Sequence, residues 1–292
     1  MRVGVVFPQT ELGGDPGAVR AYGERVESLG YAHVLVYDHV LGADATAHAP
    51  WNWPYDVHTT FHEPFVLFGF LAAVTQSVEL VTGVIILPQR QTALVAKQAA
   101  EVDLLTGGRL RLGVGVGWNA VEYEALNEDF SNRGARSVEQ IEVLRRLWTE
   151  QVVTVEGEHH HITAAGIAPL PVQRPIPVWL GTASAPGYRR VGRIADGWFP
   201  MVEPGPRLDE ARTIVDRAAT DAGRDPAAIG MEGRVSWTGD EDAVAAELAA
   251  WAEAGASHVS VNTMGAGLRT VDEHLEVLAR VATLVPHPPV SG

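Results

Sequence analysis

Short apolar runs rich in β-branched residues alternate along this chain with segments of helical periodicity. The clearest example is 78–118, which reads VELVTGVIILPQRQTALVAKQAAEVDLLTGGRLRLGVGVGW. Its first run, 78–87, is apolar on both faces, as a strand covered by helices on both sides must be. A helical stripe begins at Ala93 and stops at Gly107-Gly108, and a second strand follows at 110–116. This order of elements predicts a right-handed parallel βαβ unit.

The same unit recurs along the whole chain. Strands are predicted at 3–8, 33–38, 80–87, 110–116, 178–181, 197–200, 230–236 and 258–262, and helices at 16–29, 64–74, 93–105, 137–148, 187–194, 207–222, 242–254 and 271–284. Eight β/α units in 292 residues favour one (β/α)8 TIM barrel, a single α/β domain over 1–292. A doubly wound sheet is the alternative. Segments near 41–62 and 151–176 fall outside the repeat and are predicted to be insertions.

Composition favours a soluble intracellular enzyme. The N-terminus is not signal-like and no apolar run is long enough to span a bilayer, so a cytoplasmic location is expected. The chain has no cysteine, which excludes disulfides and thiolate catalysis. Its 22 basic and 36 acidic residues give a net charge of −14, which argues against binding to nucleic acid or to an anionic membrane. The expected partner is therefore a small-molecule substrate.

The ends of the predicted strands carry residues suited to catalysis, and active sites of (β/α)8 barrels lie at those ends. The second strand ends at Asp38-His39, and a histidine near its ordinary pKa can move a proton at neutral pH. Asp38 could orient that ring or contact a cofactor. The alternative is that Asp38 caps the next segment and that the His39 ring bonds to the backbone. Gly83, inside the third strand, indicates either a bulge that helps barrel closure or a close approach of backbone to a ligand.

Two loops that contain glycine are candidates for binding an anionic part of a cofactor. Gly115-Val116-Gly117 ends the fourth strand, where the glycines indicate close backbone approach rather than a dinucleotide motif. Gly181-Thr182-Ala183-Ser184 precedes a predicted helix, so its hydroxyls and amides can form an anion site at the helix N-terminus. Arg189, Arg190 and Arg193 on that helix either add positive charge or are simply solvated.

Aromatic residues near the strand ends are candidates for a substrate pocket. The segment 41–62 holds Trp51, Trp53, Tyr55, Phe61 and His62, and long loops of this kind commonly cover a barrel mouth. Three further rings, at the ends of strands one, four and six, complete the predicted pocket: Phe7, Trp118 and Trp198. An apolar or planar substrate follows, and packing of the rings against the barrel rim is the alternative.

The run Glu158-His159-His160-His161 raises the question of a metal site. Adjacent histidines point in opposite directions on a strand, and no carboxylate and histidine lie nearby at helical ligand spacing. We therefore predict a solvated hairpin insertion and no metal.

Further motifs follow one another at specific spacings. They are Gly30-Tyr31-Ala32-His33-Val34 before Asp38-His39, Val81-Thr82-Gly83-Val84, Leu104-Leu105-Thr106-Gly107-Gly108-Arg109, Gly113-Val114-Gly115-Val116-Gly117-Trp118, Pro175-Ile176-Pro177-Val178-Trp179-Leu180-Gly181 and Asp196-Gly197-Trp198. In this order they resemble the luciferase-like monooxygenase superfamily, and within it the branch of coenzyme F420-dependent oxidoreductases. The resemblance covers nearly the whole chain.

The resemblance implies a barrel that binds a flavin or a deazaflavin. In similar proteins a non-proline cis peptide in the third strand presses on the cofactor ring, and this would be Gly83-Val84, preceded by Thr82. Asp38 would contact the cofactor, and His39 would be the acid/base residue. The cofactor phosphate would lie between the loops 115–117 and 181–184.

Two departures from similar proteins bear on the chemistry. Flavin-binding relatives carry an arginine where this chain has Val116, which favours coenzyme F420 over FMN. Deazaflavin-dependent sugar-phosphate dehydrogenases carry a glutamate where this chain has Trp118, so their substrate is not implied and either direction of hydride transfer stays open.

Two alternatives to F420-dependent hydride transfer stay open at this point. One is an FMN-dependent monooxygenase that receives reduced flavin from a separate reductase, and the other is a non-catalytic barrel subunit. Because similar barrels commonly pair through their outer helices, a second copy of the chain is an expected partner. A flavin or F420 reductase that supplies the reduced cofactor is the other expected protein partner.

Overall fold

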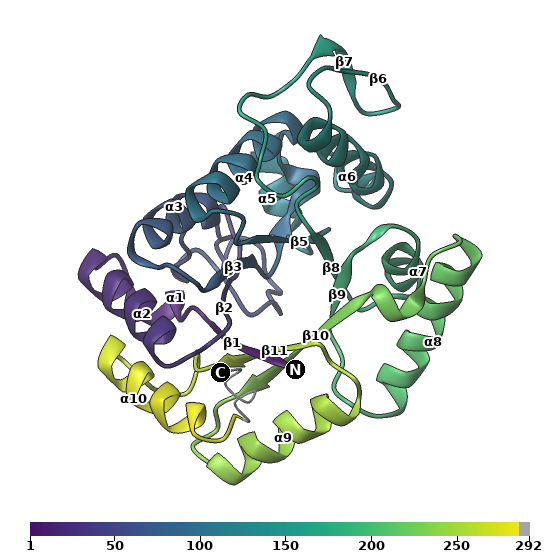
Figure 1. Ribbon diagram of the computed structural model, residues 1–292. Coiled ribbons are helices and arrows are strands. Elements are labelled where there is room, and N and C mark those ends of the chain that lie inside the picture. Colours follow the sequence, from purple (N-terminus) through teal and green to yellow (C-terminus); the bar gives the residue numbers. More distant parts are fainter. Residues whose placement is uncertain (286–292) are drawn as a thin grey trace.

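Residues 1–285, which the computed structural model describes, form a closed barrel of parallel strands ringed by helices (Figure 1). In barrel order the strands are β3 (Glu79–Thr82), β2 (His33–Val36), β1 (Arg2–Val6), β11 (His258–Asn262), β10 (Gly230–Ser236), β9 (Gly197–Pro200), β8 (Val178–Thr182), β5 (Leu110–Gly115) and β4 (Ile85–Ile86). Leu80 of β3 also pairs with Leu110 of β5, which closes the ring. The predicted (β/α)8 barrel is thus confirmed, and the doubly wound sheet is wrong because the closed ring has no free edge.

Helices cover the outside of the ring, one after nearly every strand (Figure 1). They are α1 (Gln9–Leu12), α2 (Pro16–Ser28), α3 (Pro64–Val74), α4 (Thr92–Thr106), α5 (Ala120–Ala125), α6 (Arg133–Thr149), α7 (Ala185–Ile194), α8 (Pro206–Asp221), α9 (Glu241–Glu253) and α10 (Val271–Ala282), with short 3-10 turns η1 (Leu87–Gln89) and η2 (Pro226–Ala228). Within the described residues, none of these helices is long and apolar enough to cross a membrane.

The predicted third strand, 80–87, is the one that the structure corrects most. It is broken into β3 and β4 at Gly83, and Leu87 belongs to η1. A Cβ added to Gly83 would lie 2.2 Å from Cδ2 of Leu35 on β2, so no larger residue fits there. The two halves fill one barrel position between β2 and β5, because β3 pairs with both of these strands and β4 pairs with β5.

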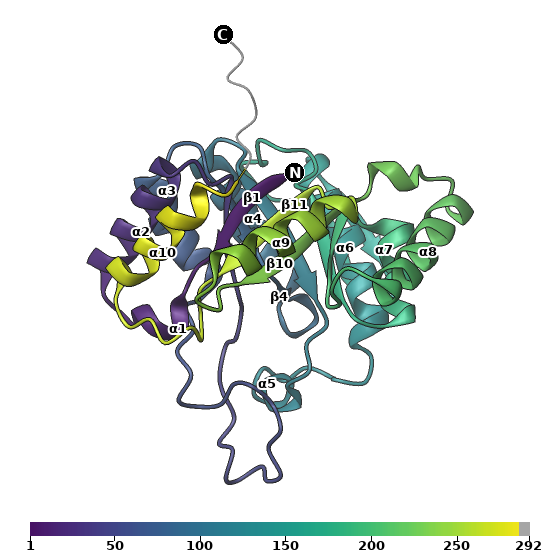
Figure 2. The ribbon, with the colours of Figure 1, turned by 90° about the horizontal axis from the view of Figure 1, so that it is seen from below.

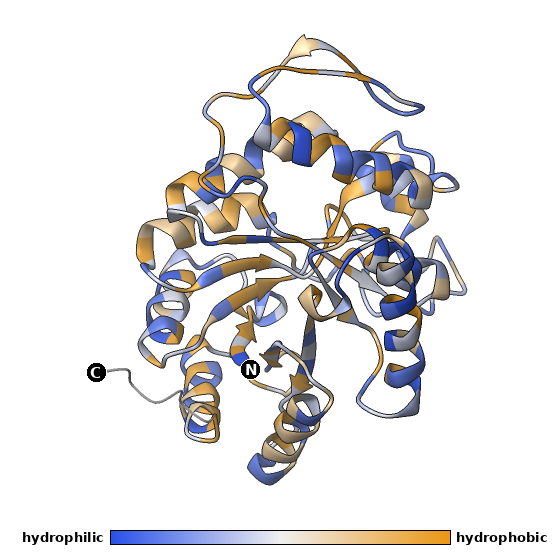
Figure 3. Ribbon diagram, turned by 45° about the vertical axis from the view of Figure 1, so that its right-hand side comes forward, coloured by the Kyte–Doolittle hydropathy of each residue, from blue (hydrophilic) through white to orange (hydrophobic). Residues whose placement is uncertain are grey.

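The strands alternate between an outer and an inner face. Outward side chains pack with the helices in the large core, and a smaller cluster fills the barrel interior: Val6, Leu35, Val81, Trp179 and Phe199. Figure 3 shows mainly hydrophobic strands at the centre, surrounded by helices that carry both hydrophilic and hydrophobic residues. This alternation decides which strand-end side chains can reach a ligand.

The barrel interior near the N-terminal ends of the strands holds a buried polar network instead of apolar side chains. Glu232 on β10 accepts hydrogen bonds from Ser260 Oγ at 2.6 Å and from Arg111 Nη1 at 2.5 Å, and its Oε1 lies 2.9 Å from His33 Nε2. Burial opposes ionisation, yet His33, Arg111 and these hydrogen bonds hold the pKa of Glu232 far below its ordinary value. The carboxylate is therefore ionised and compensated inside the fold.

Glu232→Gln is expected to flatten the acid dependence of stability. Because the folded-state pKa lies below the ordinary value of 4.5, the ionised carboxylate stabilises the fold above that pH, and this stabilisation is lost as the pH falls below it. The free energy of unfolding in urea should fall more steeply for the wild type than for the variant between about pH 5 and about pH 3. The exposed Glu253→Gln is the control, and equal slopes for all three proteins would contradict the assignment.

The long segment after β2 and the short helix α5 lie beyond the same end of the barrel, on the side opposite the N-terminus (Figure 2). That end is formed by the C-terminal ends of the strands. The second predicted insertion is an antiparallel hairpin, β6 (Val153–Glu156) and β7 (His161–Ala165), which projects beyond α6 (Figure 1).

Candidate active site

The break between β3 and β4 places Val84 at the mouth of the barrel. The Gly83–Val84 peptide is cis, as the resemblance implies. A Cβ at Gly115 would lie 2.5 Å from Val84 Cγ2, and one at Gly181 would lie 3.0 Å from Val84 Cγ1. Glycine at these two positions therefore makes room for the Val84 side chain, which stays half-buried between β5 and β8.

Thr82, predicted to contact a cofactor, lies inside the barrel wall. It is fully buried, and its hydroxyl donates to the Gly113 carbonyl at 2.7 Å. Its side chain has no free surface at the mouth. Val116 and Gly117 are half-buried at the end of β5, where Tyr123 donates to the Val116 carbonyl at 2.8 Å and Gly117 turns the chain with a φ of 65°.

His39 is held at the mouth by a glutamate that the sequence did not single out. Its Nδ1 lies 3.2 Å from Oε2 of Glu122 in the first turn of α5. The other oxygen, Oε1, accepts from the amides of Val40 at 2.7 Å and Leu41 at 3.3 Å. A carboxylate only accepts, so His39 Nδ1 carries the donated proton and Nε2 is the nitrogen left to act on a ligand.

Asp38 does not orient His39. It is 3% exposed, its Oδ1 accepts from Arg90 Nη2 at 2.7 Å, and its Oδ2 accepts from the Ile86 amide at 3.1 Å. Burial raises the pKa of this carboxyl and the adjacent Arg90 opposes the shift. Both oxygens are thus engaged in joining the end of β2 to β4 and to Arg90 after η1.

The segment 41–62 and Trp118 place aromatic rings around His39. Ring centroids of Tyr55, Phe61 and Trp118 lie 5.3, 4.7 and 5.4 Å from that of His39. Trp53 stacks on Trp118 at 4.6 Å with an interplanar angle of 19°, and Trp51 lies 5.9 Å from Trp118. A cavity of about 420 Å³ lies between this segment, His39 and Asn119.

Phe7 and Trp198 do not belong to this pocket, and their assignment to it is wrong. Phe7 is fully buried against Tyr22 of α2 at 5.1 Å, and Trp198, 2% exposed, packs against Tyr188 of α7 at 5.7 Å. Both side chains face the helices because their neighbours Val6 and Phe199 face the barrel interior. Successive strand residues point to opposite faces, so only one of each pair can face inward.

The loop between β8 and α7 presents the predicted anion-binding groups. Ser184 caps α7, with its Oγ accepting from the Gly187 amide at 3.3 Å, and Thr182 Oγ1 accepts from the Ser184 amide at 3.3 Å. Ala183 and Ser184 are exposed. On the same helix, burial and then the adjacent Arg193 lower the pKa of Arg190.

Two other features lie outside the strand ends. The His160 ring bridges Glu139, at 2.8 Å from Nδ1, and the Thr92 hydroxyl, at 2.6 Å from Nε2. No group of three or more potential metal-ligating side chains occurs among residues 1–285.

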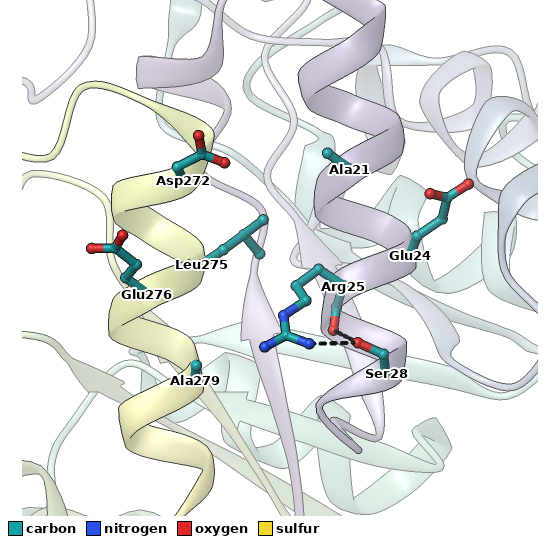
Figure 4. A pocket seen from close by; sticks show the side chains of 8 residues that line it. All are labelled: Ala21, Glu24, Arg25, Ser28, Asp272, Leu275, Glu276 and Ala279. Carbon is teal, nitrogen blue, oxygen red and sulfur yellow. Dashed lines mark hydrogen bonds between the residues drawn. The ribbon is translucent and has the colours of Figure 1, made fainter.

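A groove of about 680 Å³ runs between α2 and α10, where Arg25 lies near Ser28 (Figure 4), on the outer surface of the helices.

The chain is similar to known proteins over nearly its whole length. The model of the luciferase-like monooxygenase family matches residues 1–283. An F420-dependent glucose-6-phosphate dehydrogenase of Segniliparus rotundus is 31% identical over 229 residues, which cover 74% of this chain and 62% of that protein.

Two solved structures share the fold. An F420-dependent secondary alcohol dehydrogenase in complex with an F420-acetone adduct has a TM-score of 0.79 at 17% identity, covering 98% of this chain and 99% of that one. The monooxygenase RslO1 from Streptomyces bottropensis has a TM-score of 0.78 at 21% identity, covering 97% of both chains. Since the family model spans almost all of the described residues, this chain belongs to the luciferase-like monooxygenase family.

Proposed function

We propose that the protein is an oxidoreductase that binds coenzyme F420 at the barrel mouth and exchanges hydride with a small organic substrate. The observation that carries the proposal is His39, oriented by Glu122 through Nδ1 and enclosed by aromatic rings at the strand ends. A relative 31% identical over 74% of this chain is named as F420-dependent, which supports the choice of cofactor.

The residues at the mouth fit a flat cofactor with an anionic tail. Val84 offers an apolar surface, and the absence of side chains at Gly115 and Gly181 leaves room for it. The segment from Thr182 at the end of β8 to Ser184 at the start of α7, in which Ala183 and Ser184 are exposed, supplies amides and hydroxyls for a phosphate. When bound, coenzyme F420 supplies a carbon that gives or takes a hydride.

The chain's own residues supply the proton and the environment. Glu122 fixes the tautomer of His39, and Nε2 gives a proton to, or takes one from, the substrate oxygen or carbon. Trp118, Phe61 and Tyr55 exclude water from the ring of His39. Glu122 acts as a positioning residue because it touches His39 and the loop amides.

The proposal is tested by titrating the purified protein with F420 and with FMN while following the fluorescence of Trp118 and its neighbours. We expect F420 to bind at least about tenfold more tightly than FMN. Preference for FMN would favour the monooxygenase alternative with a partner reductase. Saturable binding of neither would reject the cofactor and favour the non-catalytic subunit.

Gly181→Leu is expected to weaken F420 binding at least about tenfold, because the new side chain would compete with Val84 for the surface proposed to support the ring. The matched control is Gly69→Leu on α3, where an added Cβ meets no atom within 4 Å. Equal affinities of the two variants for F420 would contradict the placement of the ring at Val84.

We also propose that the protein forms a homodimer, which light scattering of the same samples tests.

A further inference from the structure

Arg234 points into the barrel from β10. Along this strand Val235 belongs to the outer core, and a Cβ on Gly233 would lie 2.2 Å from the Trp251 ring of α9, so odd-numbered residues face the helices. Glu232, two residues before Arg234, reaches across the interior to other strands. By the alternation of a strand, Arg234 therefore faces the barrel interior, and it is exposed to solvent.

The guanidinium of Arg234 has no carboxylate partner among residues 1–285. Its one side-chain hydrogen bond runs from Nη1 to the hydroxyl of Tyr37, at 3.0 Å. By contrast, Arg111 in the barrel interior is paired with Glu79 and Glu232, and Arg90, which follows η1, is paired with Asp38 and Glu63. In a chain with a net charge of −14, an interior arginine without a carboxylate partner is a candidate for binding an anionic ligand.

Tyr37 offers a second donor beside it. Its hydroxyl oxygen accepts from Arg234, so its own proton is free to point toward a ligand. Burial raises the pKa of Tyr37 and Arg234 opposes the shift. Gln9 fixes this residue further by donating from Nε2 to the Tyr37 carbonyl at 2.9 Å.

Arg234 lies across the mouth from the proposed cofactor surface. In the closed ring, β10 is four positions from β3 and β4 in either direction, so it is diametrically opposite Val84. Tyr55, whose ring lies 5.3 Å from that of His39, has a pKa raised by burial and partly lowered again by Arg234. The hydrogen bond from Arg234 to Tyr37 joins β10 to the end of β2, and His39 follows two residues after Tyr37.

We propose that Arg234 and Tyr37 bind a carboxylate of the substrate, so that the substrate is an organic acid held between these donors and His39. This inference rests on the proposed function for the position of the cofactor, but the anion site itself stands on the geometry of Arg234 and Tyr37. A guanidinium and a hydroxyl match a carboxylate in charge and in number of donors.

The test is binding of benzoate and of its neutral counterpart benzyl alcohol to the wild type and to Arg234→Gln, followed by tryptophan fluorescence. We expect the wild type to prefer benzoate, and Arg234→Gln to weaken benzoate about ten- to hundredfold with little change for benzyl alcohol. Arg234→Lys should restore part of the loss because the charge returns. Arg217→Gln, whose side chain is 84% exposed on α8, is the matched control and should behave as wild type.

Other results would overturn the proposal. A wild type that binds benzoate no better than benzyl alcohol has no carboxylate site, and an Arg234→Gln variant that loses both ligands equally has lost the cavity rather than the anion contact. An F420 titration of the same variants separates this inference from the proposed function. Benzoate binding that depends on Arg234 in a protein that does not bind F420 would support the anion site alone, whereas F420 binding that depends on Arg234 without a benzoate effect would assign the arginine to the cofactor.

Discussion

Arg111→Met is expected to lower the free energy of unfolding by about 3–5 kcal/mol, since it removes one partner of a buried ion pair and leaves the other uncompensated. Arg111 is 2% exposed, bonds Glu232 and Glu79, and lies 4.3 Å from the centre of the Trp179 ring. The ionised Glu232 would keep Ser260 and His33 as partners but lose its permanent cation. Urea unfolding at neutral pH measures the difference.

Two variants control this experiment. Arg2→Met removes an exposed arginine whose contact with Glu79 is 4.0 Å, and it should cost less than about 1 kcal/mol. The double variant Arg111→Met with Glu232→Gln should recover part of the loss, because no uncompensated carboxylate remains. If Arg111→Met cost no more than Arg2→Met, the buried network would not be a determinant of stability.

His39→Gln is expected to lower kcat about 10²- to 10⁴-fold while leaving the affinity for F420 within about threefold of wild type. Glutamine can still accept or donate a hydrogen bond, but it cannot move a proton near neutral pH. The rate is measured as F420-linked turnover of the best substrate in a screen of alcohols, ketones and organic acids. His161→Gln makes the same chemical change on the exposed hairpin and should keep wild-type turnover.

Glu122→Gln separates positioning from proton transfer. An amide can present its nitrogen or its oxygen to His39 Nδ1, so the tautomer is no longer fixed. We expect a smaller loss of kcat than in His39→Gln and a displaced pH profile, with KM nearly unchanged. A His39→Gln protein with wild-type turnover would remove His39 from the chemistry, and an unshifted profile in Glu122→Gln would remove Glu122 as its positioning residue.

Local pattern predicted most of the barrel. The run 80–87 is apolar on both faces and is followed by a helical stretch with a glycine stop, so strand and helix were distinguishable without tertiary information. The interruption at Gly83 was visible as a glycine in an apolar run. Its consequence, two short strands and a half-buried Val84, depends on Leu35 from another strand.

The errors in the predicted site have two physical origins. Phe7 and Trp198 stand at strand ends, but sequence position does not tell which of two successive side chains faces inward when both are large and apolar. Thr82 and Asp38 also lie at the C-terminal ends of their strands, but their polar side-chain atoms are already hydrogen-bonded to Gly113, Ile86 and Arg90. Proximity to the mouth does not by itself leave a group free to bind.

By itself, the sequence determined the β/α order, the barrel, the strand ends that gather at one mouth, and the aromatic segment that covers His39. Only the tertiary structure decided the partners: Glu122 is 83 residues from His39, and Arg234 is 197 residues from Tyr37. The physical reason is that periodicity reports burial along one element, whereas a catalytic pair or an arginine without a counterion is defined by side chains that the closed ring brings together from distant strands.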